Sequence, residues 1–197
     1  MMAERGIRLS HMTILRWVQH IPEFEKRWHH YDRGVGPPWR VDETYIKVRG
    51  RWVYLYCAFN KQGFTVDFLL SEHRDIAAAK RFFTQAVMYH GPPERITVDG
   101  YSATHSAVAE LKKEGMLSLE LKVRTSKFLN NIIEQDHRRV KQRIYLMLGF
   151  KNFAHAAVTI SGIELVQKIR KGQFNTAGLT SEAGARVPQL WHRVLAA

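Results

Sequence analysis

Three acidic residues, widely separated along the chain, have the types and positions needed to hold a metal ion. Asp42 interrupts a segment of strand-like composition, where Asp is disfavoured. Asp99 follows a short apolar run at residues 96–98, and Glu134 opens a segment of helical periodicity. Each acid also has an ordinary structural explanation: a strand-edge charge for Asp42, a turn or helix cap for Asp99, and a capping box with Asn131 for Glu134.

Convergence of the three carboxylates would decide between these readings. Grouped carboxylates repel one another unless divalent cations neutralise them. Hard oxygen donors favour Mg²⁺ or Mn²⁺, and a single cysteine, Cys57, excludes a Cys-paired zinc site. A pair of such ions is suited to activating water and stabilising the leaving oxygen in phosphodiester chemistry. The acids therefore predict a nuclease or strand-transfer site with two Mg²⁺ ions, for which Mn²⁺ can substitute.

The elements that would position these acids follow a mixed α/β order. Strand-type composition broken by turn residues predicts a three-stranded antiparallel meander over residues 39–48, 51–60 and 64–71. Alternating helices and strands are then expected at 75–89, 95–98, 102–114, 119–123, 132–148 and 153–170. This is the order of a ribonuclease-H-like mixed sheet, in which the ends carrying the three acids lie close together.

Segments on either side of this core set the expected domain limits. Residues 1–36 are expected to form a partial helix-turn-helix, with Ser10 as a cap and Pro22 ending the helix, followed by a Gly/Pro-rich linker. The catalytic domain is expected at 37–174, and residues 175–197 read as a C-terminal tail without a clear pattern.

The charge balance favours a polyanionic partner, with DNA as the first candidate. The 197 residues include 30 Lys and Arg against 18 Asp and Glu, a net charge of +12. Residues 121–151 contain eight cationic and two acidic side chains, half of that excess. The candidate DNA contacts are Lys141, Arg138, Lys127 and Arg124, together with Arg16 on the expected N-terminal helix. A solvated helix face is the alternative explanation.

Other features narrow the expected function. No apolar run approaches the roughly 20 residues of a membrane span, and no segment resembles a signal peptide. We therefore expect a soluble intracellular protein with no membrane partner and no small organic cofactor. Cys57 lies in an apolar run and should be buried. Trp52, Tyr54 and Tyr56 alternate with apolar residues and are interpreted as sheet packing.

Several motifs in combination resemble one known family. They are WRVDETYIKV at 39–48, GRWVYLY at 50–56, TVD at 97–99, NNIIEQDH at 130–137 running on to Lys141, LGFK at 148–151 and GIE at 162–164. Thirty-four residues separate Asp99 from Glu134, the interval typical of that family. By these motifs the chain is similar to the DDE transposases of bacterial insertion sequences, in insertion-sequence family six.

This resemblance implies an integrase-like fold in which Asp42, Asp99 and Glu134 form the metal-binding catalytic triad and Lys141 contacts DNA near it. It implies cleavage at the 3′ ends of the element and transfer of the freed hydroxyl to target DNA. The implied partners are the terminal inverted repeats, target DNA and a second subunit in a homodimer, at the nucleoid of the bacterial cytoplasm. The family's N-terminal helix-turn-helix region is longer, which leaves open a truncated, non-catalytic remnant that binds DNA. Another ribonuclease-H-like nuclease is a second alternative.

Overall fold

The computed structural model describes residues 10–126, 138, 140–142, 144–145, 149–176, 189 and 194. The chain divides into two compact units. One unit is continuous and comprises residues 34–153, and the other combines residues 1–33 with 154–197. The expected limits at residues 36 and 174 stay a prediction.

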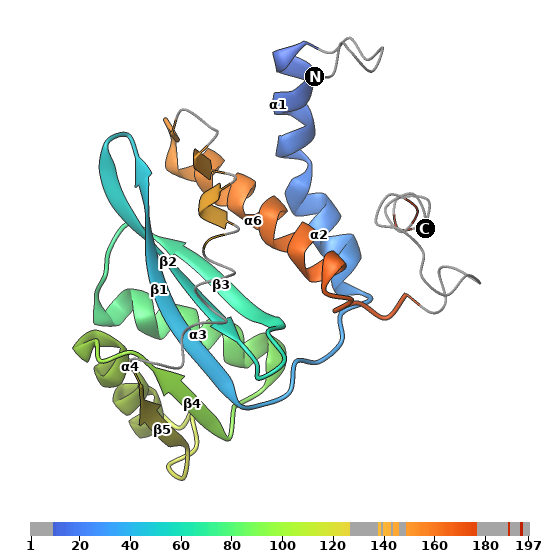
Figure 1. Cartoon of the computed structure of the whole chain (residues 1–197). Helices are drawn as coiled ribbons and strands as arrows, with labels where there is room; N and C mark the ends of the chain where they lie inside the picture. The colour runs from blue at the N-terminus through green and yellow to red at the C-terminus, as the bar shows by residue number, and fades with distance from the viewer. Residues whose placement is uncertain are drawn as a thin grey trace. The chain divides into compact units, whose positions relative to one another are not determined.

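A single five-stranded sheet is the frame of the 34–153 unit (Figure 1). Its strands are β1 (Trp39–Val48), β2 (Arg51–Phe59), β3 (Thr65–Ser71), β4 (Arg95–Val98) and β5 (Lys122–Thr125). They lie in the order β3-β2-β1-β4-β5, with β1, β2 and β3 antiparallel and β1, β4 and β5 parallel. The expected meander and the mixed α/β fold class are confirmed.

Two helices, α3 (Ile76–His90) and α4 (Ser102–Lys113), cover one face of this sheet. Asp75 begins α3 by accepting a 2.8 Å hydrogen bond from the Ala78 N–H. Phe82 and Phe83 are fully buried against Trp39 and Val41 of β1 in the main core cluster, which α4 also joins. Because side chains alternate along a strand, Glu43 shares this helix-covered face with Val41, and Asp42 points to the other face.

The last strand lies farther along the chain than the sequence predicted. Instead of residues 119–123, β5 comprises Lys122–Thr125, because its register pairs Lys122 with Arg95 at the start of β4. Leu117 and Leu121 are buried, whereas Leu119, which was expected in the strand, is 78% exposed. Leu119 and Leu121, two of the apolar residues that suggested a strand, thus belong to the preceding loop. Most of the helix expected at 132–148 falls outside the described residues, and residues 138, 140–142 and 144–145 are helical.

The other unit contains α1 (His11–Gln19), α2 (Ile21–His29) and all of α6 (Phe153–Arg170) except its first residue. Ser10 caps α1 as expected, with its Oγ 3.2 Å from the Thr13 N–H. The helix capped by Ser10 ends at Gln19, before Pro22 as expected, but Pro22 also lies in the first turn of a further helix, α2, which the sequence did not predict. A proline there costs no hydrogen bond because the first N–H groups of a helix have no intrahelical partner.

Trp28 of α2 anchors the apolar cluster of this unit. Its ring packs 4.6 Å from that of Phe174, beside Leu165 and Ile169 of α6. The Ser161 hydroxyl of α6 donates a 2.5 Å hydrogen bond to Glu25. No helix in the described part of the chain is both long and apolar enough to cross a membrane.

The core of the 34–153 unit can be tested on α3, which carries both a fully buried and an exposed large side chain. Phe82→Ala should lower the free energy of unfolding by about 3–5 kcal/mol, since it leaves a cavity against β1 and β2. Met88→Ala, at an exposed position of the same helix, should change it by less than about 0.5 kcal/mol. Urea unfolding followed by circular dichroism measures both, and equal losses would contradict this packing.

Candidate active site

The pairing of β1 with β4 places two of the expected acids at the same level of the sheet. The parallel register joins Trp39 to Ile96 and Arg40 to Thr97. Asp42 and Asp99 each lie three residues beyond the first of these pairs. Asp42 is within β1, opposite Cys57 of β2, and Asp99 is the first residue after β4. The structure thus brings Asp42 and Asp99 to adjacent strands.

The third acid, Glu134, and the candidate DNA contact Lys127 lie outside the described residues. Within the described part of the chain, no group of three His, Cys, Asp or Glu side chains could by itself hold a metal ion. The triad therefore stays a prediction, with two of its members placed. Asp42 and Asp99 offer carboxylate oxygens, which is the donor chemistry that Mg²⁺ prefers.

Asp42 borders a pocket of about 570 Å³ that contains two of the candidate DNA contacts. The pocket is lined by Asp42, Glu43, Thr44, Arg138, Lys141, Gln142 and Tyr145. Arg138 and Lys141 are both exposed. An anionic ligand at this pocket would meet two cations next to a carboxylate.

The remaining candidate cations lie elsewhere. Arg124 is exposed on β5, where it pairs in register with Thr97 of β4. Arg16 is exposed on α1, in the other unit. Arg124 is therefore on a strand next to the one that Asp99 follows, whereas nothing in the structure relates Arg16 to the acids.

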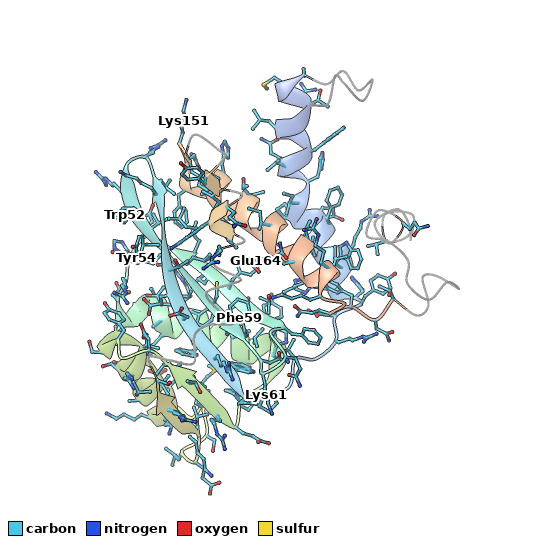
Figure 2. All side chains as sticks on the ribbon, in the orientation of Figure 1. Trp52, Tyr54, Phe59, Lys61, Lys151 and Glu164 are labelled. Atoms are coloured by element: carbon cyan, nitrogen blue, oxygen red, sulfur yellow. The ribbon has the colours of Figure 1, made fainter. Side chains whose placement is uncertain are left out.

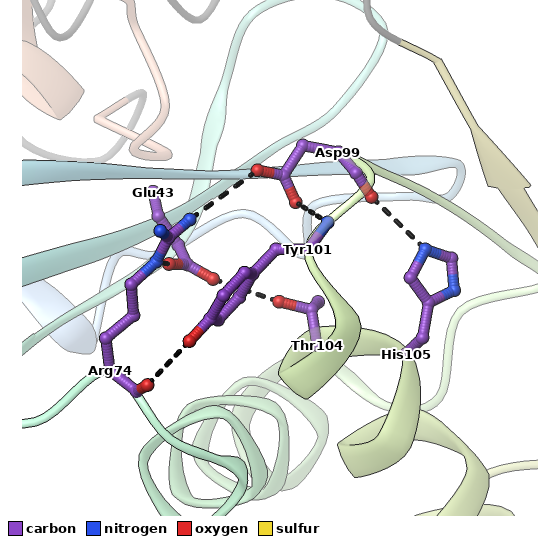
Figure 3. Close-up of polar contacts among 6 residues, drawn as sticks. All are labelled: Glu43, Arg74, Asp99, Tyr101, Thr104 and His105. Carbon is purple, nitrogen blue, oxygen red and sulfur yellow. Dashed lines mark hydrogen bonds and ion pairs between the residues drawn. The ribbon is translucent and has the colours of Figure 1, made fainter.

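Arg74 joins the two strands that carry the acids through a set of polar contacts (Figure 3). Its Nε donates a 2.6 Å hydrogen bond to Glu43, the neighbour of Asp42, and its Nη2 lies 3.9 Å from Oδ2 of Asp99. The Glu43 side chain is only 4% exposed and accepts a second hydrogen bond, of 2.9 Å, from the Thr104 hydroxyl of α4. Arg74 thus balances a nearly buried carboxylate and also approaches Asp99.

Tyr101 belongs to the same set of contacts, because it touches both Arg74 and Asp99 (Figure 3). The guanidinium carbon of Arg74 lies 3.6 Å from the centre of the Tyr101 ring, and the Tyr101 hydroxyl donates to the Arg74 carbonyl at 2.8 Å. The Tyr101 N–H donates to Oδ1 of Asp99 at 3.1 Å. The suggested helix-cap role of Asp99 is not observed, because the cap residue of α4 is Tyr101, but Asp99 does stabilise the turn.

The electrostatics of this set favour a permanently charged Arg74. Burial lowers the pKa of its guanidinium, but the hydrogen bond and charge of Glu43, with smaller effects of Tyr101 and Asp99, raise it above the ordinary value. Burial, followed by the charge of Glu43, also raises the pKa of the phenol of Tyr56, which pairs with Glu43 in the register of β1 and β2. Tyr56 therefore stays neutral, and Arg74 supplies the positive charge.

Comparison with known proteins identifies the family to which this site belongs. A family model described as a DDE domain matches residues 37–173. A transposase of the insertion sequence-like element IS431mec from Staphylococcus aureus is 36% identical over 169 residues, which cover 85% of this chain and 74% of that protein. The chain belongs to the DDE transposases of insertion sequences.

Two further comparisons agree with this assignment of the transposase. The transposase of IS257 in transposon Tn4003 of Staphylococcus aureus is 36% identical over 168 residues, covering 85% of this chain and 73% of that protein. The integrase catalytic core of HTLV-2 aligns with a TM-score of 0.52 at 18% identity, covering 81% of this chain and all of the core. The latter likeness confirms the ribonuclease-H-like fold expected from the order of elements.

Sequence reasoning missed the residues of this DDE transposase that surround Asp99. Glu43 was quoted only as part of the 39–48 motif, with no role assigned, and Arg74, Tyr101 and Thr104 belong to none of the motifs. One signal was available: an acid next to Asp42 in a strand must point to the opposite, helix-covered face, where it needs a cation. Its partner, Arg74, is 31 residues away and is revealed only by the fold.

The Glu43–Arg74 pair of the transposase predicts a measurable coupling. Removing one member of a buried pair costs about 3–5 kcal/mol; because Arg74 is 36% exposed, we expect Arg74→Met to cost about 2 kcal/mol. Adding Glu43→Gln should recover at least half of this loss, because the uncompensated charge is gone and an amide oxygen can still accept from Thr104.

Urea unfolding of the four proteins in this double-mutant cycle measures the coupling. Lys80→Met, on α3, is the control, since it removes ion pairs to Glu110 and Glu114, whose side chains are 44% and 53% exposed, and should therefore have a smaller effect. Strictly additive losses at Glu43 and Arg74 would show that the pair does not act as a unit.

Proposed function

We propose that this transposase is catalytically active, cleaving the 3′ ends of its element and joining them to target DNA through Asp42, Asp99 and Glu134. The observation that carries this proposal is the register of β1 and β4, which aligns Asp42 with Asp99 beside a pocket that contains Arg138 and Lys141. A site for a structural salt bridge alone would not require two carboxylates at one edge next to an open cationic pocket.

The three carboxylates would hold two Mg²⁺ ions, or Mn²⁺ in their place. Bound there, the ions would lower the pKa of an attacking water and stabilise charge on the leaving oxygen. The chain's own residues would fix the geometry. Asp42 is held within a paired strand, and Asp99 accepts the Tyr101 N–H through Oδ1, so Oδ2 is the oxygen nearer Arg74. In the absence of ions, Arg74 supplies part of the charge that Asp99 needs.

DNA would bind through cationic side chains of the protein. Lys141 and Arg138 would meet phosphates at the pocket, with Arg124 and Lys127 extending the contact and Arg16 contributing from the N-terminal helices. The partners would be the terminal inverted repeats and target DNA, held by a homodimer because two ends must be brought together. The place of action would be the nucleoid of the bacterial cytoplasm.

The catalytic roles are tested by Asp42→Asn, Asp99→Asn and Glu134→Gln. Metal ions supply several kcal/mol of transition-state stabilisation, so each variant should slow Mg²⁺-dependent nicking and strand transfer at least about 100-fold. The substrate is DNA carrying the sequences that flank the gene, and nicks are quantified on denaturing gels.

Glu120→Gln is the matched control, since Glu120 is an exposed acid of the same unit in the loop before β5. It should retain wild-type activity. Nicking that persists in all three site variants, or that is equally lost in Glu120→Gln, would exclude the proposed site.

The role of Lys141 is tested through the salt dependence of DNA binding. Lys141→Ala should reduce the slope of log affinity against log salt by about 1 while leaving the thermal unfolding of the protein intact. The control is Lys61→Ala, an exposed lysine in the turn between β2 and β3. Lys61 lies at the opposite end of β2 from Trp52 (Figure 2). Fluorescence anisotropy at several salt concentrations gives both slopes, and an unchanged slope for Lys141→Ala would count against a phosphate contact.

A further inference from the structure

Two large aromatic side chains are exposed on the hairpin formed by β1 and β2. Tyr45 is 55% and Trp52 is 53% accessible, and their ring centres lie 4.9 Å apart in an edge-to-face arrangement. Trp52 thus packs across the strands on Tyr45, in keeping with its interpretation as sheet packing, but it stays half-exposed, whereas Tyr56 of the same strand is buried and Tyr54 packs against the core. Figure 2 shows Trp52 farther out along the hairpin than Tyr54.

The exposure follows from the topology of the sheet. β4 pairs with β1 only at Trp39 and Arg40, so the part of β1 that contains Tyr45 extends past β4 together with β2 (Figure 1). Tyr45 and Trp52 lie on the same face of the sheet as Glu43 and Tyr56 but beyond the core that α3 and α4 build. The fold gives these rings no core to enter, so core packing does not explain their presence.

The hairpin is nevertheless held in place at its turn. Arg49 and Gly50 both have positive φ, as a two-residue hairpin turn requires. The Arg49 N–H donates a 2.8 Å hydrogen bond to the Phe150 carbonyl, and its Nε donates to the Lys151 carbonyl. The rings are thus presented on a backbone that is already fixed, which lowers the entropic cost of binding a ligand.

Cations accompany both rings. Nζ of Lys141 lies 4.9 Å from the centre of the Tyr45 ring, and Nζ of Lys47 lies 5.5 Å from that of Trp52. Lys141 also lines the pocket beside Asp42, so it links the aromatic pair to the candidate active site. Ring faces interspersed with cations match a ligand that has both flat bases and phosphates.

We propose that Tyr45 and Trp52 form a stacking site for an unpaired nucleotide of the DNA strand, with Lys141 and Lys47 contacting its flanking phosphates. This inference rests on the proposed function and specifies the form of DNA next to the active site. In a duplex the faces of the bases are hidden within the stack, so only an unpaired base offers a surface for these rings. A second copy of the chain fits less well, because a two-fold contact here would bring the lysines of both copies together.

Binding is tested with a 12-nucleotide oligo-dT strand and a mixed-sequence duplex of the same length, in EDTA so that no cleavage occurs. Base–aromatic stacking contributes about 1–3 kcal/mol per base, so Trp52→Ala and Tyr45→Ala should each weaken single-strand binding about 5- to 150-fold. Duplex affinity should change less than about two-fold, since no base face is available. Trp52→Phe should retain most of the single-strand affinity, because it keeps a ring.

Tyr89→Ala is the matched control, an exposed tyrosine on α3 of the same unit. It should leave the affinity for both DNA forms unchanged. Equal losses on single strand and duplex, no loss at all, or failure of Trp52→Phe to retain binding in a normally folded protein would overturn the stacking site. Self-association that Trp52→Ala abolishes, together with unchanged single-strand binding, would assign the surface to a second copy instead.

A cleavage assay separates this inference from the proposed function. Trp52→Ala should reduce Mg²⁺-dependent nicking of a fully paired element end, and an end with mismatched terminal bases should restore it, since opening no longer depends on stacking. Equal defects on both ends would overturn the inference. Absence of nicking in the unaltered protein would refute the proposed function but leave the binding result in EDTA valid.

Discussion

A short stretch of parallel pairing between β1 and β4 determines where the chemistry of this protein can occur. Only Trp39 and Arg40 of β1 pair with β4, yet this register aligns Asp42 with Asp99, which are far apart in the chain. Because this pairing is so short, the rest of β1 is not paired with β4, and Tyr45 is exposed. One pairing therefore sets both the position of the two acids and the surface beside them.

Acidic side chains placed close together in a folded protein repel one another, and the contacts of Arg74 offset part of this repulsion. Its guanidinium bonds Glu43, approaches Asp99 and stacks on Tyr101, so that a single cation serves β1 and the turn after β4. Because Arg74 precedes α3 and Thr104 lies on α4, both covering helices help to hold the acidic strands. The helices that build the core thus also position the side chains that contact the acids.

The sequence predicted the fold where the pattern was local. Strand composition and turn residues located the meander, Asp75 and Ser10 marked helix starts, and the motifs in combination identified the family. It failed where tertiary pairing overrides local pattern, since β5 lies where β4 can pair with it. It also did not predict that a further helix begins at Ile21, just after the helix capped by Ser10 has ended. The role of Arg74 was missed because its partner is 31 residues away in the chain. The exposure of Trp52 was missed because it depends on how far β4 extends along β1.

The path of the chain between its two units constrains how the protein is made. The 34–153 unit is one continuous segment, inserted between the N-terminal helices and α6. As the chain leaves the ribosome, the inserted unit can complete its sheet before α6 is synthesised. Trp28 of α2, however, must wait for Leu165, Ile169 and Phe174 to be translated before it is buried. Until then the nascent helices expose an apolar surface that a chaperone or another nascent chain can reach.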